Sequence, residues 1–480
     1  MEKPFAGARR PPHLLVALVP VAFLIAALWF TVVPLREFEL TTHLALISAT
    51  VVASFVAMLL GYTWKEIEEG MLGGISIALN AVVILLVIGL LIATWIQAGI
   101  VPAMIAYGLE LLSPSIFLPA ATLICALVSL ATGSSWSTAA TVGIALIGIG
   151  EGLGMPRPVV AGAIISGAYF GDKMSPLSDT TNLAPAMAGA DLFDHVRHMV
   201  YTTGPSLIIA LVIYGFIGAG STGMVDTAQV DSIQKAIRGA YAIHPALLVP
   251  PLLVVAMVVL RIPALPALIA GSALGALMAG IVQGTAWGEV LQAGYSGVAS
   301  KTGNAVVDSL LSRGGLTSMF STVALIICAL SFGGVLERAR MLESIAGSIL
   351  RLARGVGGLV SATLVTCLGM NVLASDQYLA IVVPGRMYRE AYEKAGLAPK
   401  NLSRALEDSG TLTSVLFPWN TCGAFMIATL GLAPWTYVPY CFLNLINPLV
   451  SAFYGFTGLT MHKLEAKPAT ASAAETVLAP

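Results

Sequence analysis

Glycines, prolines and polar side chains interrupt the apolar sequence at Gly167-Ala-Tyr-Phe-Gly-Asp-Lys-Met-Ser-Pro-Leu-Ser-Asp-Thr-Thr-Asn-Leu-Ala-Pro185. This stretch joins two apolar runs, 159–165 and 183–188, and its prolines Pro176 and Pro185 prevent one continuous helix. A bilayer tolerates free backbone groups only where they line a polar cavity or are buried in protein. We therefore predict a helix that is broken inside the membrane, with carboxylates and hydroxyls gathered at the break.

The composition of the whole chain agrees with a membrane location. Of its 480 residues, 57% are hydrophobic and 10% are charged, whereas soluble proteins carry about one quarter charged residues. The net charge of −1 offers no basic surface, so no nucleic-acid partner is expected. The predicted partner is the lipid bilayer. Eight apolar runs are candidate membrane spans: 13–33, 41–61, 76–98, 199–220, 246–260, 262–282, 316–336 and 436–455.

The polar interruptions occur twice, about half a chain length apart. Gly133-Ser-Ser-Trp-Ser137 is matched by Ala374-Ser-Asp-Gln-Tyr378, and Met174-Ser-Pro-Leu177 is matched by Thr413-Ser-Val-Leu416. Paired broken segments in two halves are typical of secondary transporters, whose binding sites lie between the repeats. Each half is expected to cross the membrane an odd number of times, so the second half is predicted to be inverted.

These patterns predict an all-α polytopic membrane protein with two inverted-topology repeats of about five crossings each. Each repeat contains one re-entrant hairpin and one broken helix. The predicted segments are a first repeat at 1–225 (hairpin about 114–153, broken helix about 157–190), an inter-repeat loop at 226–243, a second repeat at 244–462 (hairpin about 358–384, broken helix about 405–432) and a disordered cytoplasmic tail at 463–480.

The basic residues predict the orientation, because cytoplasmic loops are enriched in Lys and Arg. Both termini are expected in the cytoplasm, as are the basic loops around residues 338–354 and 386–404. Lys65 and Arg404 should lie on that side, and Arg238 and Lys301 should lie outside.

The first break supplies the predicted ion-binding and proton-binding residues. Sodium prefers hard oxygen ligands, which carboxylates, hydroxyls, amides and free carbonyls provide. The predicted ligands are Asp172, Ser175, Ser178, Asp179, Thr180 and Asn182, together with Asp376 at the second hairpin tip. Among them, the carboxylates of Asp172, Asp179 and Asp376 are expected to hold Na+.

Further polar residues mark the two hairpin tips and the second break: Ser134, Ser135, Thr138, Ser375, Asp408, Thr411, Thr413 and Asn420. Two acidic residues have a structural alternative. Asp376 could cap the helix that follows it, and Asp408 could cap a helix at the membrane surface. The polar run 194–198 is predicted to be an interfacial cytoplasmic turn.

These motifs carry a family resemblance. The runs 133–138, 162–185, 374–378, 397–408 and 418–423 resemble the signature of the NhaC-type sodium/proton antiporter family. The resemblance spans most of the chain. It implies a bacterial cytoplasmic-membrane protein of the ion-transporter group, built from inverted repeats, which transports Na+ or Li+ against H+ without a cofactor. Some relatives exchange organic acids such as malate and lactate instead.

The predicted mechanism is competition for one buried site. A desolvated Asp172 or Asp179 binds either a proton or sodium, so the two exclude each other. A sodium-coupled organic-acid antiporter remains an alternative, and a cation facing the cavity, such as Lys173, would favour it. An intramembrane aspartyl protease is rejected, because no partner motif for Asp172 occurs and the duplication would be unexplained. The protein is therefore expected not to be an enzyme, and a homodimer is compatible with the sequence.

Overall fold

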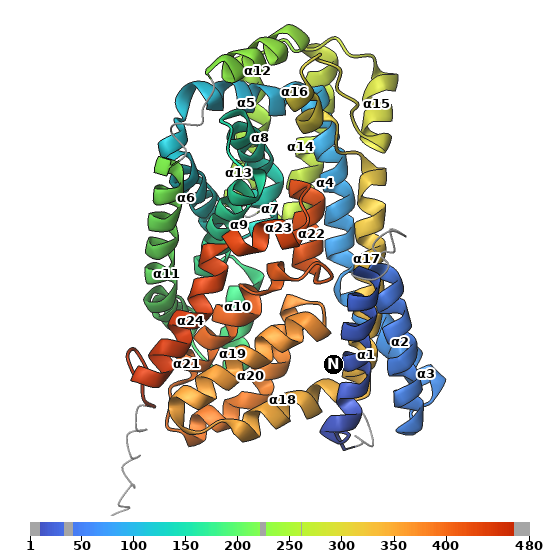
Figure 1. The fold of residues 1–480 in the computed structure, drawn as a ribbon, viewed down its shortest axis with the longest axis vertical. Coiled ribbons are helices and arrows are strands. Elements are labelled where there is room, and N and C mark those ends of the chain that lie inside the picture. Colours follow the sequence, from blue (N-terminus) through green and yellow to red (C-terminus); the bar gives the residue numbers. More distant parts are fainter. Residues whose placement is uncertain (1–9, 33–41, 221–226, 261, 465–480) are drawn as a thin grey trace, which may run out of the picture.

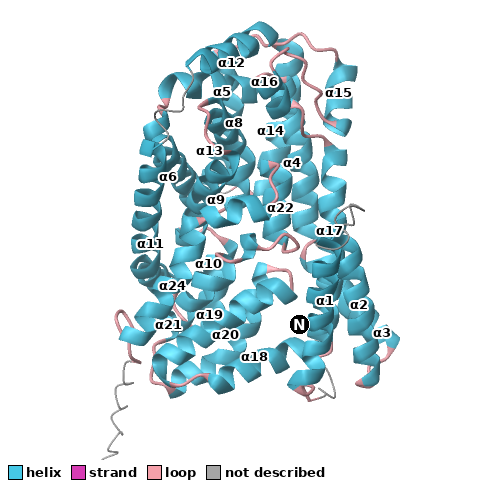
Figure 2. Ribbon diagram, in the orientation of Figure 1, coloured by secondary structure: helices cyan, strands magenta, loops and turns pink. Residues whose placement is uncertain are grey.

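The computed structural model describes residues 10–32, 42–220, 227–260 and 262–464. In these ranges the chain forms helices joined by short turns, with one isolated bridge between Leu397 and Lys463 (Figure 2). The all-helical fold class predicted from the sequence is therefore confirmed.

The described part of the first half of the chain contains eleven α-helices. They are α1 (Leu14–Val32), α2 (Thr42–Leu59), α3 (Trp64–Ile77), α4 (Leu79–Gln97), α5 (Ile100–Leu111), α6 (Pro114–Thr132), α7 (Ser135–Thr138), α8 (Ile144–Gly152), α9 (Arg157–Met174), α10 (Asp179–Ala188) and α11 (Leu192–Gly220). A π-helical turn, η2 (Ala139–Gly143), joins α7 to α8.

The second half follows with α12 (Thr227–Ala240), η3 (Pro245–Leu248), α13 (Val249–Val259), α14 (Ala264–Ile281), α15 (Trp287–Ser296), α16 (Ala305–Leu311), η4 (Leu316–Met319), α17 (Phe320–Arg338), α18 (Met341–Leu352), α19 (Gly355–Leu373), α20 (Gln377–Lys394), α21 (Pro399–Leu406), η5 (Glu407–Thr411), η6 (Ser414–Leu416), α22 (Thr421–Leu430), α23 (Pro434–Tyr437), η7 (Val438–Tyr440) and α24 (Phe442–Thr457). Of these short segments, η5 is π-helical and the other η segments are 3₁₀ turns.

Seven described helices are long and apolar enough to cross a bilayer, and nine spans result if each of two bent helix pairs counts as one. The protein is thus a multi-span helical membrane protein. Its lipid-facing surface is apolar: on α11, Ile208, Val212 and Phe216 are exposed while Ala210 and Tyr214 are buried. Exposed apolar side chains on one face of a long helix are what contact with lipid requires.

Three segments differ from the sequence-based expectations. Helix α11 begins at Leu192 instead of residue 199, so the run 194–198 is helical. The predicted loop at 226–243 contains helix α12, because Ile233 and Ile237 are one helical turn apart and both are buried. Of the predicted disordered tail, 465–480 lies outside the described residues, and Lys463 bridges to Leu397.

Two hairpin-like units occupy opposite halves of the molecule. Figure 1 shows α6 and α8 in the upper half and α19 and α20 in the lower half. Helices α12 and α16 lie at the upper end, and α18 and α21 lie at the lower end.

Helix α9 packs closely against α6 through two glycines. A Cβ atom on Gly167 would lie 2.1 Å from the carbonyl oxygen of Thr122, and one on Gly171 would lie 2.3 Å from the backbone nitrogen of Leu130. Any larger residue would therefore push the helices apart. This contact holds the broken helix against the first arm of the upper hairpin.

The described end of the chain is bonded to the start of α21. The backbone N–H of Ala398 donates to the carbonyl of His462 at 3.0 Å, and the Asn401 side-chain amide donates to the same carbonyl at 2.7 Å. The backbone N–H of His462 in turn donates to the Asn401 amide oxygen at 3.1 Å. We call residues 460–464 the C-terminal clasp.

Candidate functional site

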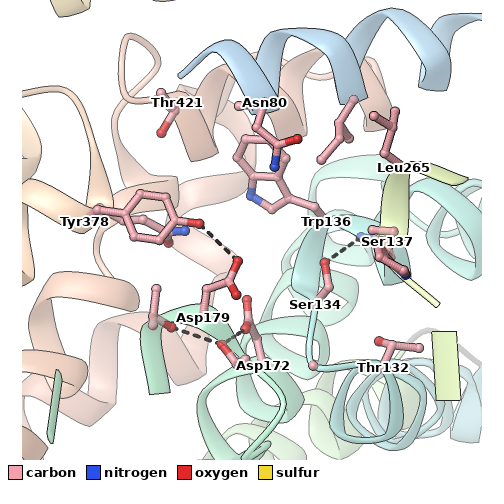
Figure 3. Close-up of a pocket in the computed structure, with 18 of the residues that line it drawn as sticks. Asn80, Thr132, Ser134, Trp136, Ser137, Asp172, Asp179, Leu265, Tyr378 and Thr421 are labelled. Atoms are coloured by element: carbon pink, nitrogen blue, oxygen red, sulfur yellow. Dashed lines mark hydrogen bonds between the residues drawn. The ribbon is translucent and has the colours of Figure 1, made fainter. Parts of the chain in front are cut away.

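A cavity of about 600 Å³ lies where the two hairpin tips meet the first broken helix. Figure 3 shows Tyr378 reaching toward Asp179 from one side, Asp172 beside Asp179, and Ser134 on the other side. Asn80 on α4 and Leu265 on α14 complete the wall. The cavity therefore draws residues from both halves of the chain.

Asp172 is the most strongly hydrogen-bonded carboxylate of the cavity. Its Oδ2 accepts from the Ser135 backbone N–H at 3.1 Å and from the Ser135 hydroxyl at 2.6 Å. Its Oδ1 accepts from the Ser178 hydroxyl at 2.5 Å. Only 7% of Asp172 is exposed. Three donors from the tip and from the break thus hold this carboxylate at the cavity wall.

The break itself runs from Ser175 to Ser178. Helix α9 ends at Met174, and Pro176 has no backbone N–H with which to continue it. Ser178 occupies the N-cap position of α10 without capping it by its side chain, because its hydroxyl is bonded to Asp172. Asn182 closes the break from the other side by donating to the carbonyls of Pro176 and Ser178.

Four of the six residues predicted at the first break line the cavity: Asp172, Ser178, Asp179 and Thr180. Asp179 is exposed to it and accepts a long hydrogen bond of 3.5 Å from the Tyr378 hydroxyl. Ser175 is buried, and its hydroxyl accepts from the backbone N–H of Leu177 at 3.3 Å. Ser175 and Asn182 therefore shape the break and are not among the residues lining the cavity.

The first hairpin tip lies directly against the break. Gly133 has a positive φ of 68°, and a Cβ atom there would lie 2.7 Å from the backbone of Leu177. Ser134 caps α7 by accepting from the backbone N–H of Ser137 at 3.1 Å, and its carbonyl accepts from the Thr138 hydroxyl at 2.9 Å. These bonds fix the turn that presents Ser135 to Asp172.

The second hairpin tip carries its own carboxylate. Asp376 caps α20: its Oδ1 accepts from the backbone N–H groups of Tyr378 and Leu379 at 2.8 and 3.3 Å. Its Oδ2 accepts from the Thr421 hydroxyl at 3.2 Å, and the side chain lines the cavity. Ser375 precedes it with a positive φ of 60°, and its buried hydroxyl has no hydrogen-bond partner among the described residues.

The two hairpin tips have the same backbone geometry, but the residues that correspond in space are shifted by one from the pairing of 133–137 with 374–378 made from the sequence. The alignment pairs Asp376 with Ser135, but both Ser134 and Asp376 are N-caps that follow a residue with positive φ. By backbone geometry, Asp376 therefore corresponds to Ser134. A shift of this kind is expected because short polar motifs have several acceptable alignments.

Asp408 is not a surface cap. It is fully buried and forms an ion pair with Lys173, and its Oδ1 also accepts from the Thr202 hydroxyl at 2.9 Å and the Asn447 amide at 2.7 Å. Helices α9, α11 and α24 pack around η5 and create this environment. It could not be predicted from a local sequence motif, because these helices are far apart in the sequence. Lys173 consequently points to Asp408 and is not among the residues lining the cavity.

The other residues predicted at the second break lie behind the cavity wall. Asn420 caps α22 by accepting from the backbone N–H of Cys422 at 3.0 Å. Thr413 donates to the carbonyl of Ser409 at 2.7 Å, and the Thr411 hydroxyl is buried without a hydrogen-bond partner among the described residues. Only the adjacent Thr421 reaches the cavity.

The predicted interfacial turn at 194–198 is wrong, since His195 and His198 are 0% and 2% exposed. Arg404, expected at an accessible loop, is 1% exposed and donates to Thr460 in the C-terminal clasp at 2.8 Å. Helix α11 carries the two histidines into the interior because its first turns pack beside α21 and the ion pair of Lys173.

The predicted site residues did not include several polar residues that line the cavity, among them Asn80, Tyr378 and Thr421. Asn80 interrupts an otherwise apolar run, which is a detectable signal inside a membrane. Tyr378 and Thr421 each lie within motifs quoted for the family resemblance, but neighbouring residues were preferred as ligands. Trp136 also lines the cavity, and its ring stacks on Phe425 of α22 with centroids 4.1 Å apart.

The charges of the cavity are of one sign. Asp172, Asp179 and Asp376 line it, while none of its described lining residues is Lys, Arg or His. No three Asp, Glu, His or Cys side chains among the described residues converge tightly enough to hold one metal ion. A cation bound here would therefore take most of its ligands from hydroxyl and carbonyl oxygens, with one or two carboxylates.

Comparison with known proteins identifies the family. The family described as "Na+/H+ antiporter family" matches residues 167–459. The chain is 38% identical to the Na+/H+ antiporter NhaC of Alkalihalophilus pseudofirmus, covering 88% of this chain and 91% of that protein.

Two other relatives carry different names. The chain is 37% identical to the malate-2H+/Na+-lactate antiporter of Bacillus subtilis, over 94% of this chain and 96% of that protein. It is 40% identical to the arginine/ornithine antiporter ArcD of Halobacterium salinarum, over 87% of this chain and 86% of that protein. With a family match over more than half of its length, and relatives of this identity over nearly all of it, the chain belongs to the Na+/H+ antiporter family.

Proposed function

We propose that the protein exchanges Na+ for H+ across the cytoplasmic membrane by competition at the cavity carboxylates. The observation that carries the proposal is the charge of the cavity, which three aspartates line without any described Lys, Arg or His. A small cation and a proton both neutralise such a site, and a carboxylate substrate would meet repulsion there.

Asp172 is the central residue of the proposed exchange. Its two oxygens accept bonds from Ser135 and Ser178, and these hydroxyls can also offer lone pairs to a cation. Sodium would bind the ionised carboxylate together with the hydroxyls of Ser178 and Thr180. A proton on Asp172 removes the charge that holds sodium, so one ligand leaves before the other binds.

The arrangement of the hairpins supports two inverted repeats. Helices α6 and α8 approach the cavity from the upper half of the molecule, and α19 and α20 approach it from the lower half (Figure 1). Both tips end at the same cavity. In the proposed cycle, the two hairpins and the broken helices move together against α4 and α14, which opens the cavity to one side at a time.

Transport by the purified protein in proteoliposomes tests the function. A pH-sensitive dye inside the vesicles should report proton efflux when NaCl is added outside, and none when choline chloride is added. Malate, lactate and arginine are tested separately, because relatives named for such substrates are similar to this chain. Proton movement that requires one of these solutes, with none caused by sodium alone, would overturn the proposal.

The inverted topology has its own test by single-cysteine labelling in cells. Lys65 and Lys394 should lie on the cytoplasmic side and Arg238 and Lys301 outside; all four are exposed. Lys394 replaces Arg404 in this experiment because Arg404 is buried. An impermeant maleimide should label the second pair only. Labelling of positions 65 and 238 from the same side would exclude the inverted arrangement.

A further inference from the structure

The cavity is larger and less polar than a site for sodium and protons requires. Its volume of about 600 Å³ lies within the roughly 300–1,000 Å³ of pockets that hold small organic molecules. Figure 3 shows Leu265 on the other side of the cavity from Asp172 and Asp179. This side of the wall is largely apolar and is formed around the α3–α4 and α13–α14 junctions by Ile77, Ile84, Val258, Ile262 and Leu265. An inorganic cation makes no use of such a surface, because its ligands are oxygen atoms.

The carboxylates of the cavity are spread along it and do not converge on one point. Tyr378 gives their spacing: its backbone N–H donates to Asp376 at 2.8 Å, and its hydroxyl donates to Asp179 at 3.5 Å. The length of one tyrosine residue therefore separates these two carboxylates, and Asp172 lies beside Asp179 (Figure 3). No three acidic, histidine or cysteine side chains among the described residues are close enough to hold one metal ion. A single sodium ion therefore cannot contact all three carboxylates.

A cation with a charge at each end of an apolar chain matches this arrangement. An ammonium group donates up to three hydrogen bonds and pairs well with carboxylates. An extended chain of five carbons has about the length of a tyrosine residue, so its two ends reach separated carboxylates. Its methylene groups gain free energy when they are buried against apolar side chains. The cavity therefore provides partners for both parts of such a molecule.

We propose that the cavity also binds and exchanges a linear alkanediamine dication of the size of 1,5-diaminopentane. One ammonium group binds Asp179 and the neighbouring Asp172, and the other binds Asp376. The methylenes between them lie against the apolar side of the wall. The inference deepens the proposed function, because the diamine occupies the carboxylates that are proposed to bind sodium. Diamine, sodium and protons then exclude one another at the same site.

The same geometry determines which organic molecules the cavity rejects. None of its described lining residues is Lys, Arg or His, so a carboxylate on the ligand would meet three aspartates without a counterion. Lysine is 1,5-diaminopentane with a carboxylate added, and it should therefore be excluded. Choline carries a positive charge but no N–H donor, so it cannot hydrogen-bond to the carboxylates and serves as the inert cation.

Calorimetry on the detergent-solubilised protein, in a sodium-free choline buffer, tests the site. 1,5-Diaminopentane should bind saturably, and added NaCl should weaken its binding by competition. 1,3-Diaminopropane should bind at least about 10-fold more weakly, because it lacks two methylenes, each of which contributes about 4-fold. Lysine should not bind at the same concentrations. Failure of the diamine to bind, or equal binding of lysine, overturns the inference and makes the cavity a water-filled access path only.

The placement of the second ammonium group is tested by changing ligand and protein together. 1-Pentylamine has the same chain with one charge, and it should bind about 10-fold or more weakly than the diamine. Asp376→Asn keeps the cap of α20 and removes the charge, so this advantage of the diamine should fall to about 2-fold or less. An advantage that persists in Asp376→Asn overturns the assignment. If the variant is not monodisperse, the wild type decides: equal affinities for diamine and 1-pentylamine overturn the proposal.

Transport separates the failure of this inference from the failure of the proposed function. Radiolabelled 1,5-diaminopentane should accumulate in proteoliposomes that are acidic inside, faster than in protein-free liposomes, and external NaCl should inhibit its uptake. Sodium-driven proton efflux without uptake of the diamine overturns the inference and leaves sodium/proton exchange standing. Uptake of the diamine without any effect of sodium overturns the proposed exchange of sodium and supports the diamine site alone.

Discussion

Each hairpin tip is bonded to a broken helix through one hydroxyl and one carboxylate, but the carboxylate lies on the helix in the first half and on the tip in the second. At the first tip the hairpin provides a neutral donor, Ser135, and the broken helix provides the carboxylate, Asp172. At the second tip the hairpin provides the carboxylate, Asp376, and the broken helix provides the hydroxyl donor, Thr421. In both halves a tip is therefore bonded to its own broken helix by one hydroxyl and one carboxylate.

The difference lies in what else each carboxylate does. Asp376 uses one oxygen to cap α20, so it is tied to the backbone of its own hairpin. Asp172 is not a cap, and two of its three donors are side-chain hydroxyls that can rotate toward a cation. We infer that the first half-site is the one that changes most during exchange, and that the second is the more rigid.

The largest effect is expected for Asp172→Asn. The variant should fold, because Asn keeps an acceptor for Ser135, but it cannot pair a charge with sodium. Sodium-driven proton efflux in proteoliposomes should fall by more than about 100-fold, the equivalent of roughly 3 kcal/mol. Exchange at the wild-type rate would show that the ion site lies elsewhere.

Asp376 is the next strongest case, and two variants separate its roles. Asn is as good an N-cap as Asp, so Asp376→Asn removes the charge and retains the cap. If the carboxylate holds sodium, this variant should raise the sodium concentration for half-maximal exchange by about 10-fold, or 1.4 kcal/mol. Asp376→Ala should in addition destabilise the protein by about 1 kcal/mol. A normal sodium dependence in Asp376→Asn would leave Asp376 a structural residue.

Asp179 connects the two tips and should show a smaller effect. It lines the cavity, but among the described residues its side chain accepts only the long hydrogen bond of 3.5 Å from the Tyr378 hydroxyl. Asp179→Asn should raise the half-saturating sodium concentration by about 5-fold, or roughly 1 kcal/mol. Tyr378→Phe is the control, because it removes only the hydroxyl that contacts Asp179. It should change the half-saturating sodium concentration by less than Asp179→Asn does. A complete loss of exchange in Asp179→Asn, together with activity in Asp172→Asn, would show that Asp179 and not Asp172 is the central carboxylate of the exchange.

The smallest effects are expected for the hydroxyl donors. Ser135→Ala leaves the backbone N–H bond to Asp172 in place, and Thr421→Val leaves the cap by Asp376 in place. Each should shift the half-saturating sodium concentration by about 3-fold or less, roughly 0.7 kcal/mol. If the first half-site is the adaptable one, Ser135→Ala has the larger shift. The opposite order would contradict the comparison of the tips.

Local patterns predicted the fold better than the site. The prolines and hydroxyls of 175–185 predicted a broken helix at about 157–190, and α9 and α10 occupy that range. Asp172 and Asp179 followed from the same break. The pair of Lys173 and Asp408 did not, because its members are 235 residues apart and meet only through tertiary packing. From the sequence, a cap at the membrane surface and a functional role were therefore both open for Asp408.

The C-terminal clasp has a practical consequence for handling the protein. Helix α21, which leads into Glu407 and Asp408, is tied to residues 460–464 by the bonds of Asn401 and Arg404. A truncation before Thr460 would remove the Thr460 partner of the buried Arg404 guanidinium and the His462 partners of the Asn401 amide. Purification tags and fluorescent fusions should therefore follow Leu464, where the chain has already made its last described contact, with Gly396.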